Sequence, residues 1–503
     1  MTTTTFNQAR SMTQTSTTIR FFVGIALSLV SMALLVFTFQ PYSFWPLAFI
    51  AYVPMLVAEY RILPLRWAGL APGIAIGGWL AIFLTSLFGL NQVTWIFLAV
   101  AGLIAMSSIL SSPTLRKFHV QTGFHWFVLQ GAVEAAGIEM IRSFIPPIFT
   151  HAFWAQTMYT QPWMLQGISI FSIYGLTMLL LLINFAIALG VILAFDHKWQ
   201  LDKQPEVDSK TGLKWMTAVG VAFALWVGFG LVTLAGAPKD SPTIRVAAVQ
   251  HGFTRPGHLD LETETARLIA LTEQTRLAAN QGAQLVVWPE LGVGFDPQVK
   301  HTAELQALAA ETNTHILIAY GIVTPNDEWR NEAVLLSPSG KFSTVYGKNY
   351  NTIPGEPRII TAGSYPVFET PLGSLATIIC NDVNFTVTTR TLARNGAKLV
   401  MIPALESGAP GLGWEQRTQV VLRAVENRIA VVKVDAAGIA MIVTPYGHII
   451  AQKTGTEPFA LVTDVPLGTG TTPYTRLGDW MGWVCLAGFV VFSVVTNRKN
   501  AAK

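Results

Sequence analysis

The segment Pro371-Leu-Gly-Ser-Leu-Ala-Thr-Ile-Ile-Cys380-Asn-Asp382 joins an apolar run to a short polar turn. The apolar residues 375–379 predict a buried strand, and residues 386–395 can form the helix that follows. A thiol at such a turn lies near backbone N–H groups and a helix N-terminus, which lower a thiol pKa and stabilise an oxyanion. Cys380 is therefore a candidate nucleophile, but the default interpretation of a single cysteine is a core residue, so it needs partners.

The composition is that of an integral membrane protein. Of the 503 residues, 51% are hydrophobic and only 12% are charged, whereas soluble domains carry roughly 25% charged residues. The net charge is only +4 and the basic residues are not clustered, which argues against a nucleic-acid partner. The second cysteine, Cys485, lies in a C-terminal apolar run, so we expect no disulfide with Cys380.

Eight apolar runs are candidate membrane spans. They cover residues 21–39, 44–57, 68–88, 93–110, 124–145, 168–195, 215–234 and 480–495. Most can cross a hydrocarbon core of roughly 30 Å, whereas the second and the last need flanking residues to do so. Residues 1–18 are polar and rich in threonine, which predicts a disordered cytoplasmic leader, and the first run has no clear cleavage site after it.

The loop charges predict the orientation. Positive side chains lie before the first run and in alternate loops, for example at Arg61, Arg116 and Lys198, and again after the last run. The positive-inside rule makes these loops and both termini cytoplasmic. We therefore expect a seven-span bundle at 19–236, an extracytoplasmic domain at 240–470 and a C-terminal membrane helix at 476–497.

The fifth run contains ionisable residues. Glu139 and Arg142 are three positions apart, so they share a helix face and can pair, and Glu134 lies one turn earlier. Charges within a span often mark function. A structural pair near the outer boundary and a functional site are equally good interpretations.

The segment between the last two runs has a different pattern. Strand-like and helix-like stretches alternate from residue 244 to residue 452, which predicts an α/β domain with a core of its own. The sequence shows no repeat, no glycine-rich phosphate loop and no metal-spaced His/Cys cluster. We therefore expect neither a metal nor a cofactor.

Three further residues of this domain can supply chemistry. The strand-like residues 285–288 lead to Glu290, whose partly desolvated carboxylate suits a general base. Lys348 follows another short strand-like run and can hold a thiolate or an oxyanion. Glu356 follows a Pro-Gly turn and could return to the same site. Taken alone, each of these residues is better explained as a helix cap or an exposed surface side chain than as a catalytic group.

Together, these residues resemble the nitrilase superfamily, whose members use a Glu-Lys-Cys triad and have an α-β-β-α sandwich fold. The landmarks are the opening strand 245–250, Trp-Pro-Glu290, Gly-Lys348, Glu356, Cys380 and the helix at 423–427. The resemblance implies such a sandwich here.

Seven spans before this domain and one after it resemble the apolipoprotein N-acyltransferase family. Short motifs in the same order carry the likeness, namely Trp45-Pro-Leu, Pro54, Glu139-Met-Ile-Arg142, Tyr174-Gly175, Ile183-Asn184 and 472–480. The resemblance implies an enzyme of the bacterial cytoplasmic (inner) membrane with its catalytic domain outside. Its substrates would be a membrane phospholipid and the α-amino group of an S-diacylglyceryl cysteine at the start of an apolipoprotein.

The resemblance also implies a role for each residue. Glu290 would take the proton of Cys380, which attacks the lipid ester and forms a thioester. Lys348 and the backbone N–H after Cys380 would hold the oxyanion, and Glu356 would orient Lys348 or assist the base. The amine then takes the acyl chain in a second step, as in covalent catalysis generally.

The chain departs from the family pattern around the nucleophile. Asn381 and Asp382 replace an aromatic residue and a glutamate, and both are candidate supporting residues. Residues 402–410 replace an Asn-Asp-x-Trp-like sequence, and Leu259 stands where a tryptophan is expected. These positions shape the pockets, so the acceptor stays open.

Four other functions remain as alternatives: a paralogue that acylates another amine, a membrane-anchored amidase, a non-catalytic scaffold and, more weakly, a transporter. The loops at 253–260, 291–300 and 403–413 contain the Gly and Pro residues that would permit a lid.

Overall fold

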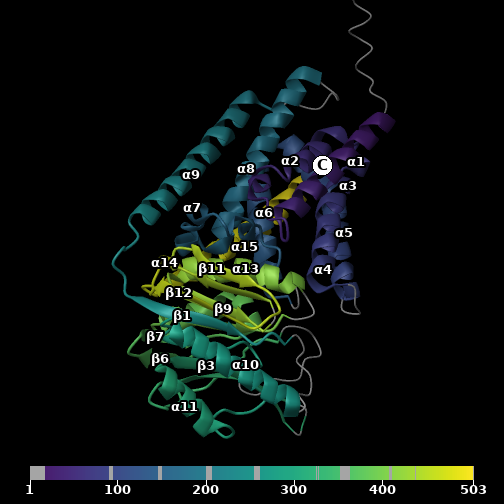
Figure 1. Cartoon of the computed structure of the whole chain (residues 1–503). Helices are drawn as coiled ribbons and strands as arrows, with labels where there is room; N and C mark the ends of the chain where they lie inside the picture. The colour runs from purple at the N-terminus through teal and green to yellow at the C-terminus, as the bar shows by residue number, and fades with distance from the viewer. Residues whose placement is uncertain are drawn as a thin grey trace, which may run out of the picture.

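Long apolar helices form one end of the molecule and two stacked β-sheets form the other (Figure 1). This computed structural model describes residues 17–89, 94–145, 150–199, 207–253, 261–324, 326, 328–351, 363–406, 410–436 and 438–501. The predicted leader at 1–18 and the residue Glu356 lie outside these ranges, apart from the leader's last two residues, which already belong to the first helix.

The helical end is built from helices of very different length. The long ones are α1 (Thr17–Thr38), α4 (Gly78–Phe88), α5 (Thr94–Gln121), α6 (Phe127–Arg142), α8 (Ile168–Trp199), α9 (Ser209–Ala235) and α15 (Trp480–Ala501). Between them lie short pieces: η2 (Trp45–Phe49), α2 (Val53–Val57), η3 (Ala58–Ile62), η4 (Leu65–Trp67), α3 (Leu70–Pro72), η5 (Gly73–Gly77), η6 (Trp154–Met158) and α7 (Pro162–Leu165).

Within the described ranges, six helical segments are long and apolar enough to cross a membrane, so the predicted count of eight is not confirmed. The predicted second span, 44–57, is broken into the short helices η2 and α2. The predicted fifth span is α6, which has 16 residues and a length of only about 24 Å at 1.5 Å per residue. Both segments pack against α8, while Ile50 and Ile138 are each 42% exposed.

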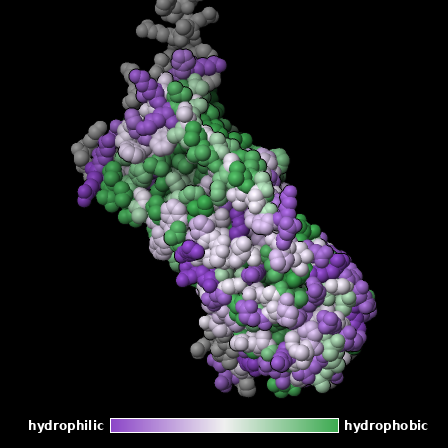
Figure 2. Space-filling view, turned by 90° about the vertical axis from the view of Figure 1, so that its left-hand side faces the viewer, coloured by the Kyte–Doolittle hydropathy of each residue, from purple (hydrophilic) through white to green (hydrophobic). Residues whose placement is uncertain are grey.

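The outer surface of this end is apolar. Leu103 and Leu110 on α5 are each 70% exposed, and Leu225 and Val232 on α9 are 69% and 72% exposed. Figure 2 shows apolar side chains over the helical end and a more polar surface over the sheets. Such a large exposed apolar surface is stable against lipid rather than water, and the chain is a multi-pass membrane protein.

The other end contains two six-stranded sheets. The first has the order β12 (Phe459–Pro466), β1 (Thr243–Gln250), β2 (Leu285–Val287), β3 (His315–Val323), β4 (Trp329–Leu336) and β5 (Tyr346–Gly347). The second has the order β11 (Ile449–Thr454), β10 (Ile439–Val443), β9 (Ala430–Asp435), β8 (Leu399–Ala404), β7 (Gly373–Thr377) and β6 (Val367–Thr370).

Each sheet has three neighbouring parallel strands at its centre. In the first, Ala248 of β1 aligns with Val287 of β2, which aligns with Leu317 of β3. In the second, Thr377 of β7 aligns with Met401 of β8, which aligns with Val432 of β9. Because parallel strands end at the same edge of a sheet, the residues after β2, β7, β8 and β9 can meet at one place.

The predicted α-β-β-α sandwich is confirmed. Alternate residues of β1 face opposite ways: Val246 and Ala248 lie in the core shared with the second sheet, whereas Ala247 and Val249 pack with Leu271 of α10 (Leu261–Asn280). The helix α11 (Thr302–Thr312) completes that outer layer. The helices α12 (Thr386–Arg394) and α13 (Pro410–Asn427) cover the second sheet.

The helix α13 joins the sandwich to the bundle, as Figure 1 shows. Its Glu415 accepts a hydrogen bond of 2.6 Å from Gln156, and Gln419 donates to Thr150 at 3.0 Å. Arg417 donates to Gln40 after α1 at 3.0 Å. These buried contacts fix the sandwich against the bundle, because a buried polar group without its partner costs about 1–3 kcal/mol.

The charged residues of α6 support the same junction. Glu139 accepts hydrogen bonds of 2.7 Å from the Trp154 backbone and from the Thr177 hydroxyl. Arg142 donates to the carbonyl of His151 at 2.5 Å. Both side chains therefore hold the segment 150–156, which contains Thr150 and Gln156, the partners of α13. This favours a structural role for Glu139 and Arg142.

Candidate active site

Cys380 occupies a sharp turn after β7, the strand next to the β6 edge of the second sheet. It begins the short helix η7 (Cys380–Asn384) with a φ of 48°, and α12 follows from Thr386. A left-handed conformation costs a non-glycine residue roughly 1–3 kcal/mol and is concentrated at functional sites. The predicted strand-to-helix turn is confirmed, and it directs the thiol away from the end of β7 into the space between the sheets.

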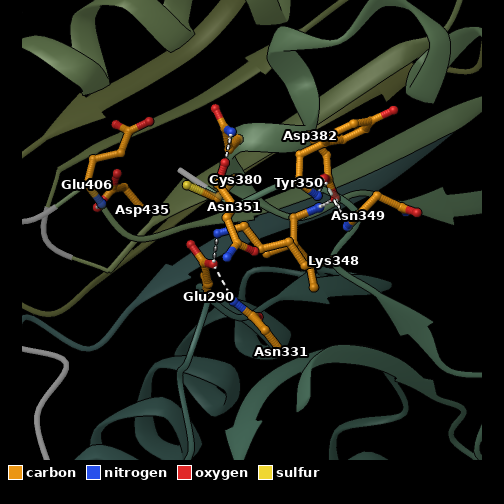
Figure 3. A network of polar contacts seen from close by, with 12 residues as sticks. Glu290, Asn331, Lys348, Asn349, Tyr350, Asn351, Cys380, Asp382, Glu406 and Asp435 are labelled. Carbon is orange, nitrogen blue, oxygen red and sulfur yellow. Dashed lines mark hydrogen bonds and ion pairs between the residues drawn. The ribbon is translucent and has the colours of Figure 1, made fainter. Parts of the chain in front are cut away.

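Glu290 and Lys348 meet in the first sheet (Figure 3). Glu290 follows β2 and Lys348 follows β5, and both are 3% exposed. The Lys348 ammonium donates to the Glu290 carboxylate at 2.9 Å. Asn331 of β4 donates to the same oxygen at 2.7 Å and accepts a bond from the Lys348 backbone at 2.9 Å.

Sequence reasoning missed Asn331. It lies inside a strand with no motif around it, so only its position opposite Lys348 in the sheet reveals its role. Its amide fixes one carboxylate oxygen of Glu290, and its carbonyl fixes the start of the loop that carries Lys348. The ion pair is therefore held in place by a third residue before any substrate binds.

The thiol of Cys380 lies between charged groups. Its side chain is buried, and burial is the main reason why its pKa is raised above the usual value. The negative charge of Glu290 raises the pKa further, and the ammonium of Lys348 opposes this. Gln416 of α13 donates to the sulfur at 3.4 Å. The resting group is thus a neutral thiol that needs a base to become a nucleophile.

Asp382 ties the nucleophile turn to the loop after Lys348. Its carboxylate accepts from the Tyr346 hydroxyl at 2.6 Å and from the backbone of Ile379 at 3.1 Å. It also accepts from the backbone of Asn349 at 3.1 Å and of Tyr350 at 2.9 Å. Burial raises the pKa of Asp382 to about 6, although these donors oppose the shift.

Asn381 holds the other side of this loop. Its amide nitrogen donates to the carbonyl of Asn351 at 2.5 Å, and its oxygen accepts from Asn384 at 2.7 Å. The supporting residues that the sequence singled out, Asn381 and Asp382, thus lie beside the thiol and position its surroundings. Glu356 and Leu259 are outside the described residues. So are residues 254–260 and 407–409 of the predicted lid loops 253–260 and 403–413, whereas the third loop, 291–300, is described.

A second charged cluster lies on the other side of the thiol. Glu406 follows β8, whereas Lys433 and Asp435 belong to β9, and all three side chains are buried. The Lys433 ammonium lies 3.3 Å from Glu406 and 3.6 Å from Asp435. The sequence marked residues 402–410 only as a departure, because a lysine within a strand-like run gives no signal of a buried partner. No described group of His, Cys, Asp and Glu is arranged to hold a metal ion.

Comparison with known proteins places this geometry in a family. The family model "Carbon-nitrogen hydrolase" matches residues 245–472, and "Apolipoprotein N-acyltransferase N-terminal domain" matches residues 31–186. The first match covers both sheets and the candidate site, and the second covers α4, α5, α6 and parts of α1 and α8.

Relatives of full length show the same combination. The chain is 23% identical over 510 residues to apolipoprotein N-acyltransferase of Geobacter metallireducens, which covers 94% of this chain and 95% of the relative. It is 24% identical to apolipoprotein N-acyltransferase of Chlorobaculum tepidum, over 90% of this chain and 91% of the relative.

Similarity to amidases covers a smaller part of the chain. Human omega-amidase NIT2 is 26% identical over 38% of this chain and 80% of its own length. A solved amidase from Nesterenkonia sp. is 26% identical over 46% of this chain and 92% of its own, with a TM-score of 0.37. Two family models in order and full-length relatives together show that the chain belongs to the apolipoprotein N-acyltransferase family, within the carbon–nitrogen hydrolase (nitrilase) superfamily.

Proposed function

We propose that this protein is an N-acyltransferase that moves an acyl chain from a phospholipid to the α-amino group of the S-diacylglyceryl cysteine of apolipoproteins. The observation that carries the proposal is the buried Glu290–Lys348 ion pair beside the Cys380 thiol, in a sandwich fixed to a lipid-facing bundle. The full-length relatives, which are named for this activity, support it.

The first half-reaction loads the enzyme. Glu290 takes the thiol proton, and the sulfur of Cys380 attacks the ester carbonyl of the phospholipid. Lys348, whose charge acts on the thiol, stabilises the tetrahedral oxyanion, a contribution typically worth about 10²–10³-fold in rate. The C–O bond then breaks, Glu290 returns the proton to the leaving oxygen, and a lysophospholipid departs from a thioester of Cys380.

The second half-reaction unloads the enzyme. The acceptor amine attacks the thioester carbon, the C–S bond breaks, and an amide and the free thiol result. An uncharged amine is required, because an ammonium has no lone pair for the attack. A base must therefore remove a proton from the acceptor before or during this step.

The junction between α4 and α13 supports a lipid donor. A cavity of about 160 Å³ lies there, and Pro41, Phe83, Leu87 and Trp414 are among its lining residues. Trp414 is two positions before Gln416, which contacts the thiol. This largely apolar space can take part of an acyl chain at the junction of the bundle and the sandwich. The proposal includes a catalytic domain outside the membrane and both termini in the cytoplasm, as the loop charges predict.

The test is acyl transfer by the purified protein in phospholipid vesicles. A synthetic peptide that begins with S-diacylglyceryl cysteine should gain the mass of one acyl chain while lysophospholipid accumulates, and the Cys380→Ala protein should produce neither. Release of free fatty acid without acylated peptide would instead indicate a hydrolase. Acylation of a different amine would indicate a paralogue with another acceptor.

A further inference from the structure

Two carboxylates approach Cys380 from opposite sides, and the mechanism above uses only one. In the view of Figure 3, the sulfur lies between Glu290 and the pair formed by Glu406 and Asp435. The charge of Glu406 acts on the thiol, and the backbone N–H of the preceding residue, Leu405, bonds to the same sulfur. Glu406 is therefore next to the reacting atom.

The Glu406 carboxylate contacts the Asp435 side chain and pairs with Lys433 through one oxygen only. Its Oε2 lies 3.3 Å from the Lys433 ammonium, whereas its Oε1 is buried and has no hydrogen-bond partner in the part of the chain that the structure describes. Glu406 is only 7% exposed. A buried acceptor that bonds neither protein nor water costs about 1–3 kcal/mol, and more when charged, so this atom is suited to a donor that arrives with a substrate.

A second acceptor beside the thiol is also unpaired. Gln416 donates its Nε2 hydrogen to the sulfur, while its Oε1 is buried without a partner among the described groups. The two atoms of one amide are close together, so this oxygen also lies near the thiol. Two open acceptors match a ligand that donates several hydrogen bonds.

The charges point to the same ligand. Two carboxylates, Glu406 and Asp435, surround a single cation, Lys433. When all three are ionised, the cluster carries one net negative charge in a buried place. A plain structural ion pair would not need the second carboxylate, whereas a bound ammonium group would neutralise it.

We propose that Glu406 binds the acceptor's ammonium group beside the thioester and takes its first proton, with Gln416 as a second acceptor. This inference rests on the proposed function and adds the residues that recognise the amine. Burial and the neighbouring Asp435 raise the pKa of Glu406 above its usual value, which brings it closer to that of an amine and suits it to this transfer.

The step balances in atoms and charge. The ammonium gives one proton to Glu406 and becomes an amine, whose nitrogen forms the C–N bond with the thioester carbon. As the C–S bond breaks, the nitrogen loses a second proton, which Glu290 passes to the sulfur of Cys380. The products are the amide and the thiol, and Glu406 then releases its proton to solvent.

The experiment separates the two half-reactions. The protein is first loaded with phospholipid, and the acyl adduct is measured by intact-protein mass spectrometry. The adduct is then discharged either with the diacylglyceryl-cysteine peptide, whose amine is largely protonated at pH 7, or with hydroxylamine, which is uncharged. Glu406→Gln is compared with the native protein and with Glu264→Gln, which removes a carboxylate from an ion pair with Lys300 on the outer layer.

We expect Glu406→Gln to load normally and to react with hydroxylamine at the native rate. Discharge by the peptide should be about tenfold slower at pH 7, and the difference should shrink above pH 8, because an α-amino group loses its proton near pH 7.7–8.0. Glu264→Gln should match the native protein throughout.

The inference would be overturned if the peptide discharged the Glu406→Gln protein at the native rate. It would also be overturned if discharge by hydroxylamine were slowed as much as discharge by the peptide. If Glu406→Gln does not fold, Glu406→Asp replaces it, and its discharge by the peptide should be slower than native but should retain the native pH dependence. A native-like rate for that variant would also overturn the inference. Failure of the native protein to load would instead refute the proposed function itself.

Discussion

Each sheet of the sandwich places one carboxylate–lysine pair beside Cys380, and the two pairs differ in how firmly they are held. In the first sheet, the Glu290–Lys348 contact is 2.9 Å and Asn331 fixes the same carboxylate oxygen. In the second, the Glu406–Lys433 contact is 3.3 Å and one oxygen of Glu406 is open.

The difference separates two chemical tasks. Activating a thiol that never leaves its turn needs a base and a cation fixed in advance, which the first pair provides. Receiving an amine that comes from another protein needs an acceptor that is still unoccupied, which the second pair provides. One nucleophile can then be loaded from one side and unloaded from the other.

The largest effects should come from the first pair. Glu290→Gln removes the base and Lys348→Met removes the cation, so each should slow formation of the acyl adduct by about 10²–10⁴-fold. Glu406→Gln should change this step less than threefold. Single-turnover mass spectrometry measures all three. If Glu406→Gln slowed adduct formation as much as these two variants, the two pairs would not have separate tasks in loading and unloading.

The second pair should dominate stability. Lys433→Met leaves two buried carboxylates without their cation, and breaking a buried pair in this way costs about 3–5 kcal/mol. Thermal unfolding in detergent should show a lower midpoint for Lys433→Met than for Glu406→Gln, and the double variant should recover part of the loss. A native midpoint for Lys433→Met would show that the cluster is not ionised.

The sequence predicts part of this fold and part of this site. Periodicity and apolar runs predicted α1, α8, α9, α15 and most strands of the sandwich, but not β4, β6 or β12. They did not predict that residues 44–57 break into short helices, because packing against neighbouring helices decides this rather than local hydropathy. Glu290, Lys348 and Cys380 are recognisable since each ends a strand-like run.

The remaining site residues have no local signal. Asn331 and Lys433 lie within strands, and their roles depend on which residue the register places opposite them. Glu139 and Arg142 interact on one helix face, as the sequence suggested, but their hydrogen bonds to Trp154 and His151 had no local signal. Long-range contacts of this kind follow from the tertiary fold alone.

Asp382 should give a smaller, pH-dependent effect. Its folded pKa of about 6 lies above the ordinary value of an aspartate, so its contribution to stability is fully present below about pH 4 and is lost as the pH rises through 6, to a total of about 3 kcal/mol. Asp382→Asn does not titrate. The unfolding midpoint of the native protein relative to this variant should therefore fall between pH 4 and pH 7, and a constant difference would contradict the buried, titrating carboxylate.

The smallest effect concerns the thiol itself. Because burial and Glu290 raise its pKa, alkylation of Cys380 in a Cys485→Ala background should still be rising at pH 9, by about tenfold per pH unit. Lys348→Met removes the charge that lowers the pKa and should react several-fold more slowly. Peptide mass spectrometry gives both rates, and a plateau below pH 8 would show a thiolate already present at rest.

The most direct test of the account is whether a lipid acyl chain becomes attached to Cys380. The purified native protein and its Cys380→Ala variant are incubated with phospholipid vesicles, and their intact masses are measured before and after hydroxylamine. We predict the added mass of one acyl chain on the native protein only, removed by hydroxylamine as a thioester is. Absence of the adduct from the folded native protein, or its presence on Cys380→Ala, would contradict the account.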